Sequence, residues 1–372
     1  MHADDAVAEA RRLLRLCAAC MYCDDLCPVF AAIAGRHAFS AADLAYVGNL
    51  CHSCKACHYA CQYAPPHAFA VNLPRSLARV RQISYADYAR PRFLRGAFAG
   101  GFPRVSTALV AVAVAAFEFL RAGVAGHAGL IGFYDIVPER WMLLSMLGAL
   151  LAAAASLAWS ACAFWADIGP PAGLREILCA APRAISESIA LTHLGGDGPG
   201  CADGPDLAPQ ARRWAHHLLV AGLATDFSAS IAAAFSEHWL GMAPPFPASS
   251  APVVLGVAGG ALVLGGVCGL VWLKRRADPE PVAAETAGAD YQLLGMIALV
   301  VVSGSALLAA RSTTGMPWLL ALHLGLVVSF FALLPASKFV HAIYRAAALL
   351  RATVESRARA GERPPPDLAA GA

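Results

Sequence analysis

Six long apolar runs dominate the chain after residue 105 and limit what it can fold into. Each approaches or exceeds the ~20 residues with which an α-helix crosses a bilayer. Hydrophobic residues make up 58% of the chain and charged residues only 14%, whereas roughly 25% of a soluble domain is charged. We therefore expect a mainly α fold with a polytopic six-helix transmembrane domain. The runs cover residues 105–121, 141–166, 213–235, 252–273, 291–310 and 317–337.

The distribution of Lys and Arg predicts how these helices are oriented. Seven arginines precede the first run, between residues 75 and 104. Basic residues are also frequent in the segments 167–213, 274–276 and 345–363, and sparse in the segments that alternate with them. Because cytoplasmic loops carry the excess of Lys and Arg, we expect a multi-pass protein of the inner membrane with both termini in the cytoplasm.

Composition divides the chain into four parts. Residues 1–73 form a cysteine-rich head, and residues 74–104 read as a basic amphipathic linker at the cytoplasmic membrane surface. The transmembrane domain follows over residues 105–351. Residues 352–372 are polar and end in PPPDLAAGA, so we expect a disordered tail. Within the longest connecting segment, the stretch GGDGPGCADGP at 195–205 indicates turns.

Eight of the 12 cysteines fall between residues 17 and 61, in two motifs of one spacing. Both motifs read C-x₂-C-x₂-C-x₃-C, the spacing of bacterial two-cluster ferredoxins. The first three cysteines, each separated from the next by two residues, can bind three irons of one cubane. The fourth cysteine reaches the other cluster. We therefore expect a ferredoxin-like head with two [4Fe–4S] clusters. The predicted ligands are Cys17, Cys20, Cys23 and Cys61 for cluster one, and Cys27, Cys51, Cys54 and Cys57 for cluster two.

Zinc sites or a disulfide cluster would use the same residue type. Zinc sites usually group two close pairs, whereas here four cysteines repeat twice at one rigid spacing. The first 16 residues lack the apolar core of a secretory signal, so we expect the thiols to stay in the reducing cytoplasm. The sequence departs from the ferredoxin pattern at Gln62, which follows Cys61, whereas Pro28 follows Cys27.

Histidines in the spans are candidate haem ligands, because polar groups inside a membrane are costly and tend to be functional. His216 and His217 lie at the cytoplasmic start of the third helix, and His238 lies at its outer end. His323 and His341, on the last helix, are 18 residues apart, which is five whole turns and predicts one shared face. In antiparallel helices, His216 or His217 can pair with His341, and His238 with His323. Bis-histidine ligation of this kind could hold one or two b-type haems.

Simpler roles compete with this interpretation. All of these histidines except His323 lie near helix ends, where a histidine can simply sit at the water interface. Lys338, Tyr344 and Arg345 are near His341 in sequence. They are candidates for contacting haem propionates or a quinone, and they could equally be interfacial anchors.

Several motifs resemble the family called tricarballylate-utilisation or citrate-utilisation protein B. The resemblance covers about residues 10–352 and implies a membrane protein with two [4Fe–4S] clusters and a b-type haem. It also implies a path for electrons from a separate FAD-containing tricarballylate dehydrogenase to the membrane quinone. The motifs are the second cysteine motif with the following QYAPPHAFAVNLP, RRWAHHLL at 212–219, APPFP at 243–247, LLAARSTTG at 307–315 and LALHLGLVVSFFALLPASKFVHAIYR at 320–345.

The rest of the sequence separates this role from other classes. No GxGxxG turn joins a strand to a helix, so a flavin would have to sit on a partner. We therefore expect an electron-transfer subunit whose partner flavoprotein oxidises the substrate. No basic stripe with interleaved aromatics indicates nucleic-acid binding. An alternative is a membrane iron–sulfur redox sensor or assembly factor, and an ion-coupled transporter would need more deep acidic groups than Glu118 and Asp226.

Overall fold

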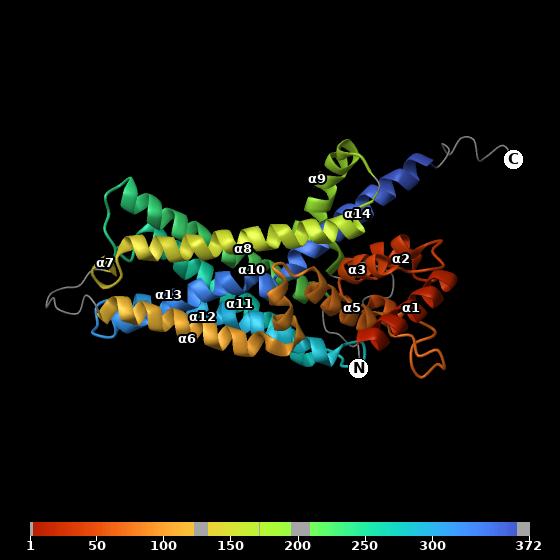
Figure 1. Ribbon diagram of the computed structural model, residues 1–372, viewed down its shortest axis with the longest axis horizontal. Helices are drawn as coiled ribbons and strands as arrows, with labels where there is room; N and C mark the ends of the chain where they lie inside the picture. Colours follow the sequence, from red (N-terminus) through yellow and green to blue (C-terminus); the bar gives the residue numbers. More distant parts are fainter. Residues whose placement is uncertain (1–2, 123–132, 171, 195–208, 363–372) are drawn as a thin grey trace.

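The computed structural model describes residues 3–122, 133–170, 172–194 and 209–362 (Figure 1). Over these residues the regular structure is helical, without strands, which confirms the predicted mainly α fold. The molecule is elongated, with a compact head at one end from which long helices extend to the other end (Figure 1). The turns expected at 195–205 lie outside the described residues.

The head is a small helical domain with its own core. Ser40 begins α3 with a capping box, in which its side chain and that of Asp43 each bond the other's backbone N–H. Side chains that are at most 1% exposed fill the core, among them Leu13, Ile33 and Leu77. The head helices are α1 (Ala3–Cys20), α2 (Pro28–Ile33), α3 (Ala41–Leu50), α4 (Ala56–Tyr59) and α5 (Leu73–Tyr88), with the short turn η1 (Asp24–Leu26).

Helix α5 belongs to the head, although its composition suggested the start of a surface linker. It packs against α1 and α3 and buries Leu77, Val80 and Tyr85. Its arginine at position 81 is also buried. The boundary drawn at residue 73 therefore falls inside packed structure, and only short turns, η2 (Arg92–Leu94) and η3 (Ala97–Gly101), link α5 to the first long helix.

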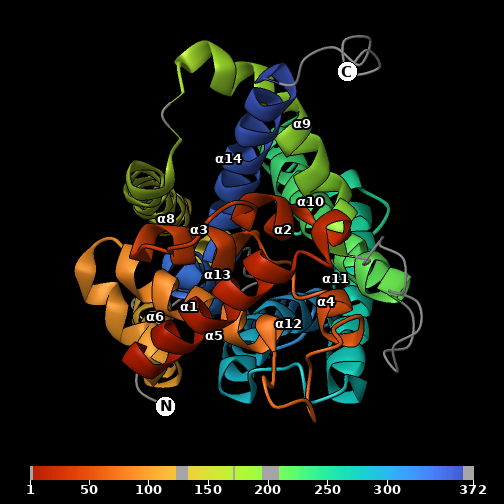
Figure 2. The same ribbon diagram turned by 90° about the vertical axis from the view of Figure 1, so that its right-hand side faces the viewer.

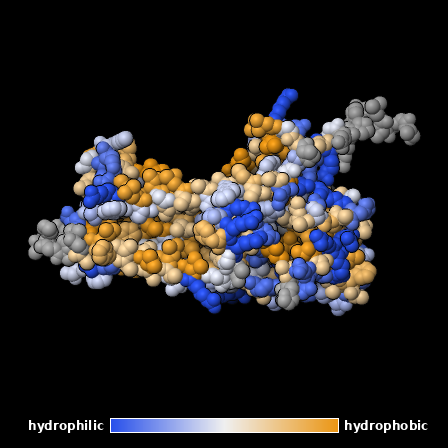
Figure 3. All heavy atoms as spheres, viewed as in Figure 1, coloured by the Kyte–Doolittle hydropathy of each residue, from blue (hydrophilic) through white to orange (hydrophobic). Residues whose placement is uncertain are grey.

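Among the residues that the structure describes, six helical segments are long and apolar enough to cross a membrane, as predicted. Successive long helices run in opposite directions between the head and the far end (Figure 1). Apolar residues cover the sides of these helices, and hydrophilic residues gather on the head (Figure 3). These features are those of a multi-pass membrane protein. The long helices are α6 (Phe102–Ala122), α8 (Glu139–Ile168), α10 (Pro209–His238), α11 (Ala251–Arg276), α12 (Ala287–Ala309) and α13 (Met316–Leu333).

The last apolar segment is not one continuous helix, which corrects the expectation for its histidines. Helix α13 ends at Leu333, the turn η6 (Leu334–Ala336) follows, and α14 (Val340–Glu362) begins after an extended Ser337. Pro335 lies in this break, and proline lacks the N–H that a continuing helix requires. His323 and His341 therefore lie on different helices, so the shared face predicted from their spacing is wrong.

The chain is also ordered beyond residue 351, where we expected a disordered tail. Helix α14 continues to Glu362 because it packs on the head: Arg36 Nη2 lies 3.2 Å from Glu355 Oε1, and Arg359 Nη1 donates to Ala31 O at 2.6 Å. Residues 363–372 lie outside the described part. The connecting segment after α8 contains a helix that we did not predict, α9 (Leu174–Ala190), which lies beside α14 (Figure 2).

Candidate functional site

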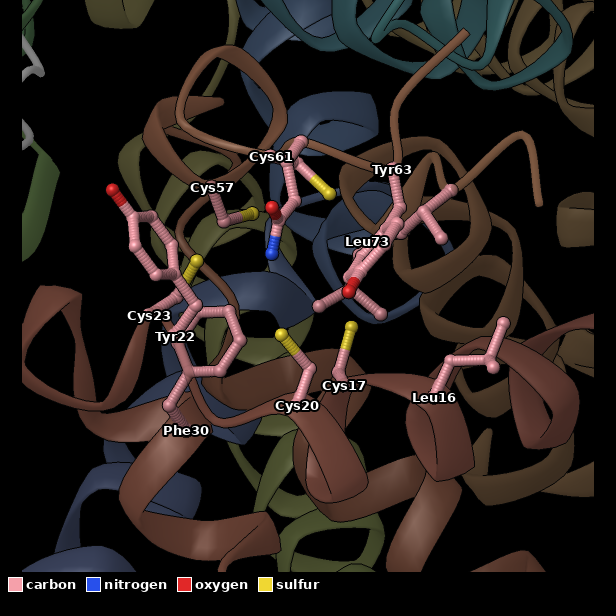
Figure 4. A pocket seen from close by; sticks show the side chains of 12 residues that line it. Leu16, Cys17, Cys20, Tyr22, Cys23, Phe30, Cys57, Cys61, Tyr63 and Leu73 are labelled. Atoms are coloured by element: carbon pink, nitrogen blue, oxygen red, sulfur yellow. The ribbon is translucent and has the colours of Figure 1, made fainter. Parts of the chain in front are cut away.

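Four cysteines from two neighbouring segments of the head surround one cavity. Cys17 and Cys20 lie in the last turn of α1, Cys23 follows in the next turn, and Cys61 comes shortly after α4. Their sulfur atoms point into the same space (Figure 4). These are the residues predicted to bind cluster one. The cavity opens near Tyr22, which is 70% exposed, and its other walls are Leu16, Phe30, Cys57, Gln62, Tyr63, Val71 and Leu73.

Left-handed backbone turns shape both cysteine motifs in the same way. The residue after the second cysteine has positive φ in each motif, 50° at Met21 and 70° at Lys55, and Ser53 has a φ of 53°. Non-glycine residues rarely adopt this conformation, and they persist in it where the surrounding structure requires it. At Met21 the turn follows an N–H···O bond of 2.9 Å to Cys17 O. The turn reverses the chain and brings the third cysteine back towards the first.

The other four cysteines form the second group, which adjoins the first. Cys27 directly precedes α2, and Cys51 directly follows α3. The Cys27 thiol interacts electrostatically with Cys51 and Cys54, and the Cys57 thiol interacts with all three. Cys57 also lines the first cavity. The chain thus brings together the four residues predicted for cluster two, next to those predicted for cluster one.

The protein surroundings alone hold four of these thiols, those of Cys17, Cys23, Cys27 and Cys57, in the protonated form. Burial, with the charges of neighbouring cysteines, raises the pKa of Cys17 to about 12 and of Cys23 to about 11. Burial and the charges of neighbouring cysteines also raise the pKa of Cys27 and Cys57. The thiolate is the metal-binding form, so a bound cationic centre must supply the stabilisation that ionises the group.

No disulfide joins any two of the described cysteines. In the described part of the chain, no three His, Cys, Asp or Glu side chains could hold a metal ion. A cubane carries its irons at four corners, so its ligands need not converge on one point as the ligands of a single ion must.

A larger cavity, of about 640 Å³, lies between the head and the long helices. We call it the interface cavity. One wall is formed by residues 51–54, which we call the cluster-two loop. This loop contributes His52, Ser53 and Cys54 to the cavity. The other walls come mainly from α5, α10, α11, α12 and α14. Many lining side chains are basic or imidazole groups: His52, Arg81, Arg212, His216, Lys274, Lys338, His341 and Arg345. Polar groups in an otherwise apolar pocket of this size are typical of cofactor sites.

His216 and His341 face each other in the interface cavity. Their ring centroids are 6.4 Å apart and the rings are nearly perpendicular, at 78°. Two imidazoles on opposite sides of one metal ion have centroids about 6 Å apart, because each metal–nitrogen bond is ~2.0 Å. The Nδ1 of His341 donates to Lys338 O at 2.6 Å, which leaves Nε2 as the free ligand atom. The Nδ1 of His216 is buried and has no partner among the described residues.

The other predicted histidines have different surroundings. His217 does not line the interface cavity, and its Nε2 lies 3.2 Å from a backbone carbonyl of α9. His238 Nε2 lies 3.2 Å from Glu139 Oε1 at the far end. His323 Nδ1 lies 2.9 Å from Ser303 Oγ on α12. His238 and His323 thus have separate partners, and only the predicted pairing of His216 with His341 corresponds to a ring contact in the described chain.

Lys338 and Arg345 line the interface cavity, as their nearness to His341 suggested. Lys338 forms an ion pair with Asp290. Tyr344, in contrast, is buried in the core and packs on Phe164 with ring centroids 4.7 Å apart.

Three basic residues of this site were missed by the sequence reasoning. Arg81 and Arg212 were counted only as charges that set the orientation of the helices, and so was Lys274, which pairs with Asp290. For Arg212 a signal was present in the sequence, because it lies four residues before His216 and therefore one helical turn away.

The surroundings of His52 show how positive this region is. Burial lowers the pKa of His52 well below its ordinary value, and the charges of Arg345, His193 and Arg81 act in the same direction. The ring therefore stays neutral at pH 7 and adds no positive charge to the wall of the interface cavity. It packs against the ring of His193, with centroids 5.3 Å apart.

Comparison with known proteins gives consistent results for both halves of the chain. Residues 10–87 match the model for the "Citrate utilization protein B Fer4-like domain", and residues 104–362 match "Citrate utilization protein B". No solved structure is significantly similar. The protein named "Citrate utilization protein B" from Escherichia coli is 36% identical over 360 residues, which cover 94% of this chain and 93% of that protein. The chain therefore belongs to the citrate utilization protein B family, with a Fer4-like head that gives it an iron–sulfur electron-transfer role.

Proposed function

We propose that this protein carries electrons from the reduced FAD of a partner dehydrogenase to the membrane quinone pool. The observation that carries the proposal is the arrangement of two adjoining cysteine groups between an exposed face of the head and the interface cavity. Such a row of sites suits stepwise electron transfer, because it leads from the protein surface towards the membrane helices.

The cysteine groups are proposed to hold two [4Fe–4S] clusters. Each cluster, when bound, supplies a one-electron redox centre. The protein contributes thiolate ligands, apolar walls that exclude water, and backbone turns that fix the spacing of the ligands. Cluster one would be bound by Cys17, Cys20, Cys23 and Cys61, and cluster two by Cys27, Cys51, Cys54 and Cys57.

The interface cavity is proposed to hold one b-type haem, which His216 and His341 would bind through their imidazoles. The fit is supported by the centroid distance of 6.4 Å, by the buried Nδ1 of His216, and by the cavity volume of about 640 Å³. When bound, the haem would supply a further one-electron centre. Lys338, which lines the same cavity, would supply positive charge for its propionates. We propose one haem rather than two, because His238 and His323 each have another partner.

The proposed donor is a flavoprotein dehydrogenase that oxidises a tricarboxylate of the citrate or tricarballylate type. The name of the E. coli relative refers to citrate utilization, and the motifs described above resemble those of tricarballylate utilisation. The head is proposed to face the cytoplasm of the inner membrane, because the segments rich in Lys and Arg lie on its side of the spans.

Spectroscopy of the full-length protein, purified in nanodiscs, tests the proposal. The expected result is two interacting [4Fe–4S] signals in EPR after reduction, together with the visible bands of a reduced b-type haem. Cys20→Ser is expected to remove cluster one, whereas Cys268→Ser, which changes an exposed cysteine of α11, is expected to leave both signals intact. Zinc in place of iron at the cysteine sites would refute the proposal.

A further inference from the structure

Three arginines from three different helices bind the backbone of the cluster-two loop. Arg81 of α5 donates to Cys51 O at 2.6 Å, and Arg345 of α14 donates to the same oxygen at 3.2 Å. Arg212 of α10 donates to Ser53 O at 2.7 Å. The head, α10 and α14 thus meet at one short stretch of backbone that carries predicted cluster ligands.

Helices α10 and α14 use the same pair of residue types, a histidine and an arginine, for this contact. On α10, Arg212 precedes His216 by four residues, and on α14, Arg345 follows His341 by four residues. Residues four apart lie on one face of a helix, about one turn from each other. Each helix therefore directs an imidazole into the interface cavity and, one turn nearer the head, a guanidinium to the cluster-two loop.

The charges on Arg81 and Arg345 are not neutralised by neighbouring acids. The bonds recorded for both guanidinium groups go to backbone carbonyls or, for Arg81, also to the hydroxyl of Ser53 at 3.2 Å. No carboxylate of the described residues lies within 4.0 Å of either group. The Nε of Arg345 is buried without a partner in the described part of the chain. Two positive charges therefore act on the cluster-two loop in a partly buried setting.

The cavity of the cluster-one cysteines has no such charges. Its walls are cysteines, apolar side chains, tyrosines and Gln62. Arg12, on the same helix as Cys17, is compensated by Glu9 at 2.7 Å. The two cysteine groups thus have the same ligands and different electrostatic surroundings.

We propose that Arg81 and Arg345 give cluster two the higher reduction potential, so that a single electron shared by the two clusters resides on cluster two, beside the His216–His341 pair. The proposal rests on the proposed function, because it needs a cluster at each cysteine group. Reduction adds one negative charge to a cluster, and a nearby positive charge stabilises that form, more strongly where the dielectric constant is low. Arg212 and Arg345 also act as positioning residues that fix the cluster-two loop to the two helices bearing the histidines.

The expected effect is large enough to measure. A unit charge about 10 Å from a cluster, at an effective dielectric constant of about 20, changes the ratio of reduced to oxidised cluster by about tenfold. For a one-electron centre, a tenfold change equals about 59 mV. Removal of one guanidinium is therefore expected to lower the potential of cluster two by about this amount and that of cluster one, which lies farther from the charge, by less.

The test is a redox titration, followed by EPR, of the full-length protein in nanodiscs. Arg345→Gln removes the charge and retains hydrogen-bonding capacity, and Arg345→Lys retains the charge. Arg95→Gln is the matched control, since Arg95 is exposed and paired with Asp87 at 2.8 Å. Signals are assigned to the clusters from Cys20→Ser and Cys54→Ser proteins. We expect the Gln variant to shift cluster two clearly more than cluster one, and the Lys and Arg95 variants to stay close to the parent.

A second variant covers the case in which Arg345→Gln fails to assemble cluster two. Ser53→Asp places a carboxylate beside Arg81, at a left-handed position that Asp tolerates. It is expected to lower the potential of cluster two, whereas Ser53→Asn is not. The inference would be overturned if the potentials stayed unchanged or if both clusters shifted equally. It would also be overturned if Ser53→Asp and Ser53→Asn had equal effects. A protein without iron–sulfur clusters would instead refute the proposed function.

Discussion

The packing of α10 on α11 provides a test of the haem site that leaves every proposed ligand in place. A Cβ added at Gly266 of α11 would lie 2.5 Å from the backbone N of Leu219 and 2.8 Å from Ala215 O. These α10 residues flank His216 in the sequence. Ordinary contacts between such atoms begin at about 3.5 Å, so Gly266→Ala must move the two helices apart by about 1 Å. Overpacking of this kind typically costs about 1–3 kcal/mol.

The displacement would matter for the proposed haem because a bond from His216 to its iron could not stretch by the same amount. The bond is ~2.0 Å long, so a shift of His216 by about 1 Å relative to His341 should weaken one axial bond. We expect the Gly266→Ala protein to fold with reduced thermal stability. Its haem should change in part from a six-coordinate to a five-coordinate spectrum.

The matched control is the preceding glycine. A Cβ at Gly265 would meet no atom within 4 Å, so Gly265→Ala should keep the parent spectrum and stability. The assay is visible and EPR spectroscopy of the oxidised protein, with thermal unfolding measured on the same samples. If both variants kept the parent spectrum while Gly266→Ala lost stability, the haem would not lie between His216 and His341.

Two further predictions concern the interface cavity and the contacts that close it. His216→Ala should abolish the six-coordinate haem spectrum, whereas His217→Ala should preserve it; equal loss in both would contradict the assignment of the ligand. Asp278 accepts hydrogen bonds from the backbone N–H of Glu280 and from the hydroxyl of Tyr59, and these bonds hold its pKa below the ordinary value. The bond with Tyr59 joins the α11–α12 loop to the head. It is fully present above about pH 4 and weakens as the pH falls further. Proteolysis of the loop should therefore increase on acidification, and Asp278→Asn should show the increase already at pH 7. Cleavage independent of pH in the parent would refute this.

The cysteine groups could be predicted because their geometry is local. Within each motif the positions of the thiolates depend on three short spacings and a reversal of the backbone, and both are properties of neighbouring residues. The left-handed turns at Met21 and Lys55 could not be read from those residue types, since neither is a residue that favours this conformation. The spacing indicated that the chain had to turn there, and the structure shows how it does so.

The histidines could be predicted only in part, because their positions depend on packing between distant helices. The face shared by His323 and His341 assumed an unbroken helix, and the break around Pro335 removes that assumption. The choice between His216 and His217 depends on how α10 is rotated against its neighbours. Close approach to α11 at glycines such as Gly266 sets that rotation, and helical periodicity alone contains no information about the partner.

The number of arginines in residues 74–104 led us to predict a surface linker where α5 in fact packs in the head. This error too arose because the prediction lacked knowledge of contacts between distant residues. Arginines usually mark exposed surface, and the seven in this region suggested a linker at the membrane. Arg81 is nevertheless only 7% exposed, because the backbone carbonyls of Gly48 and Cys51 accept hydrogen bonds from its guanidinium. The burial of such an arginine can be predicted from a sequence only when its hydrogen-bond acceptors are known. Here the acceptors lie about thirty residues earlier in the chain.

The order of the two cysteine groups also suggests where a donor approaches. Cys20 is exposed and Tyr22 is 70% exposed, whereas Cys54 faces the interface cavity. Because electron transfer requires close approach, we expect the partner flavoprotein to dock over Tyr22. Tyr22→Arg should therefore slow reduction by the partner severalfold and leave reduction by dithionite, a small diffusible donor, unchanged. Phe93→Arg is the control, since Phe93 is 79% exposed but lies in the segment linking α5 to α6. Equal slowing by both variants would show that the donor reaches the head elsewhere.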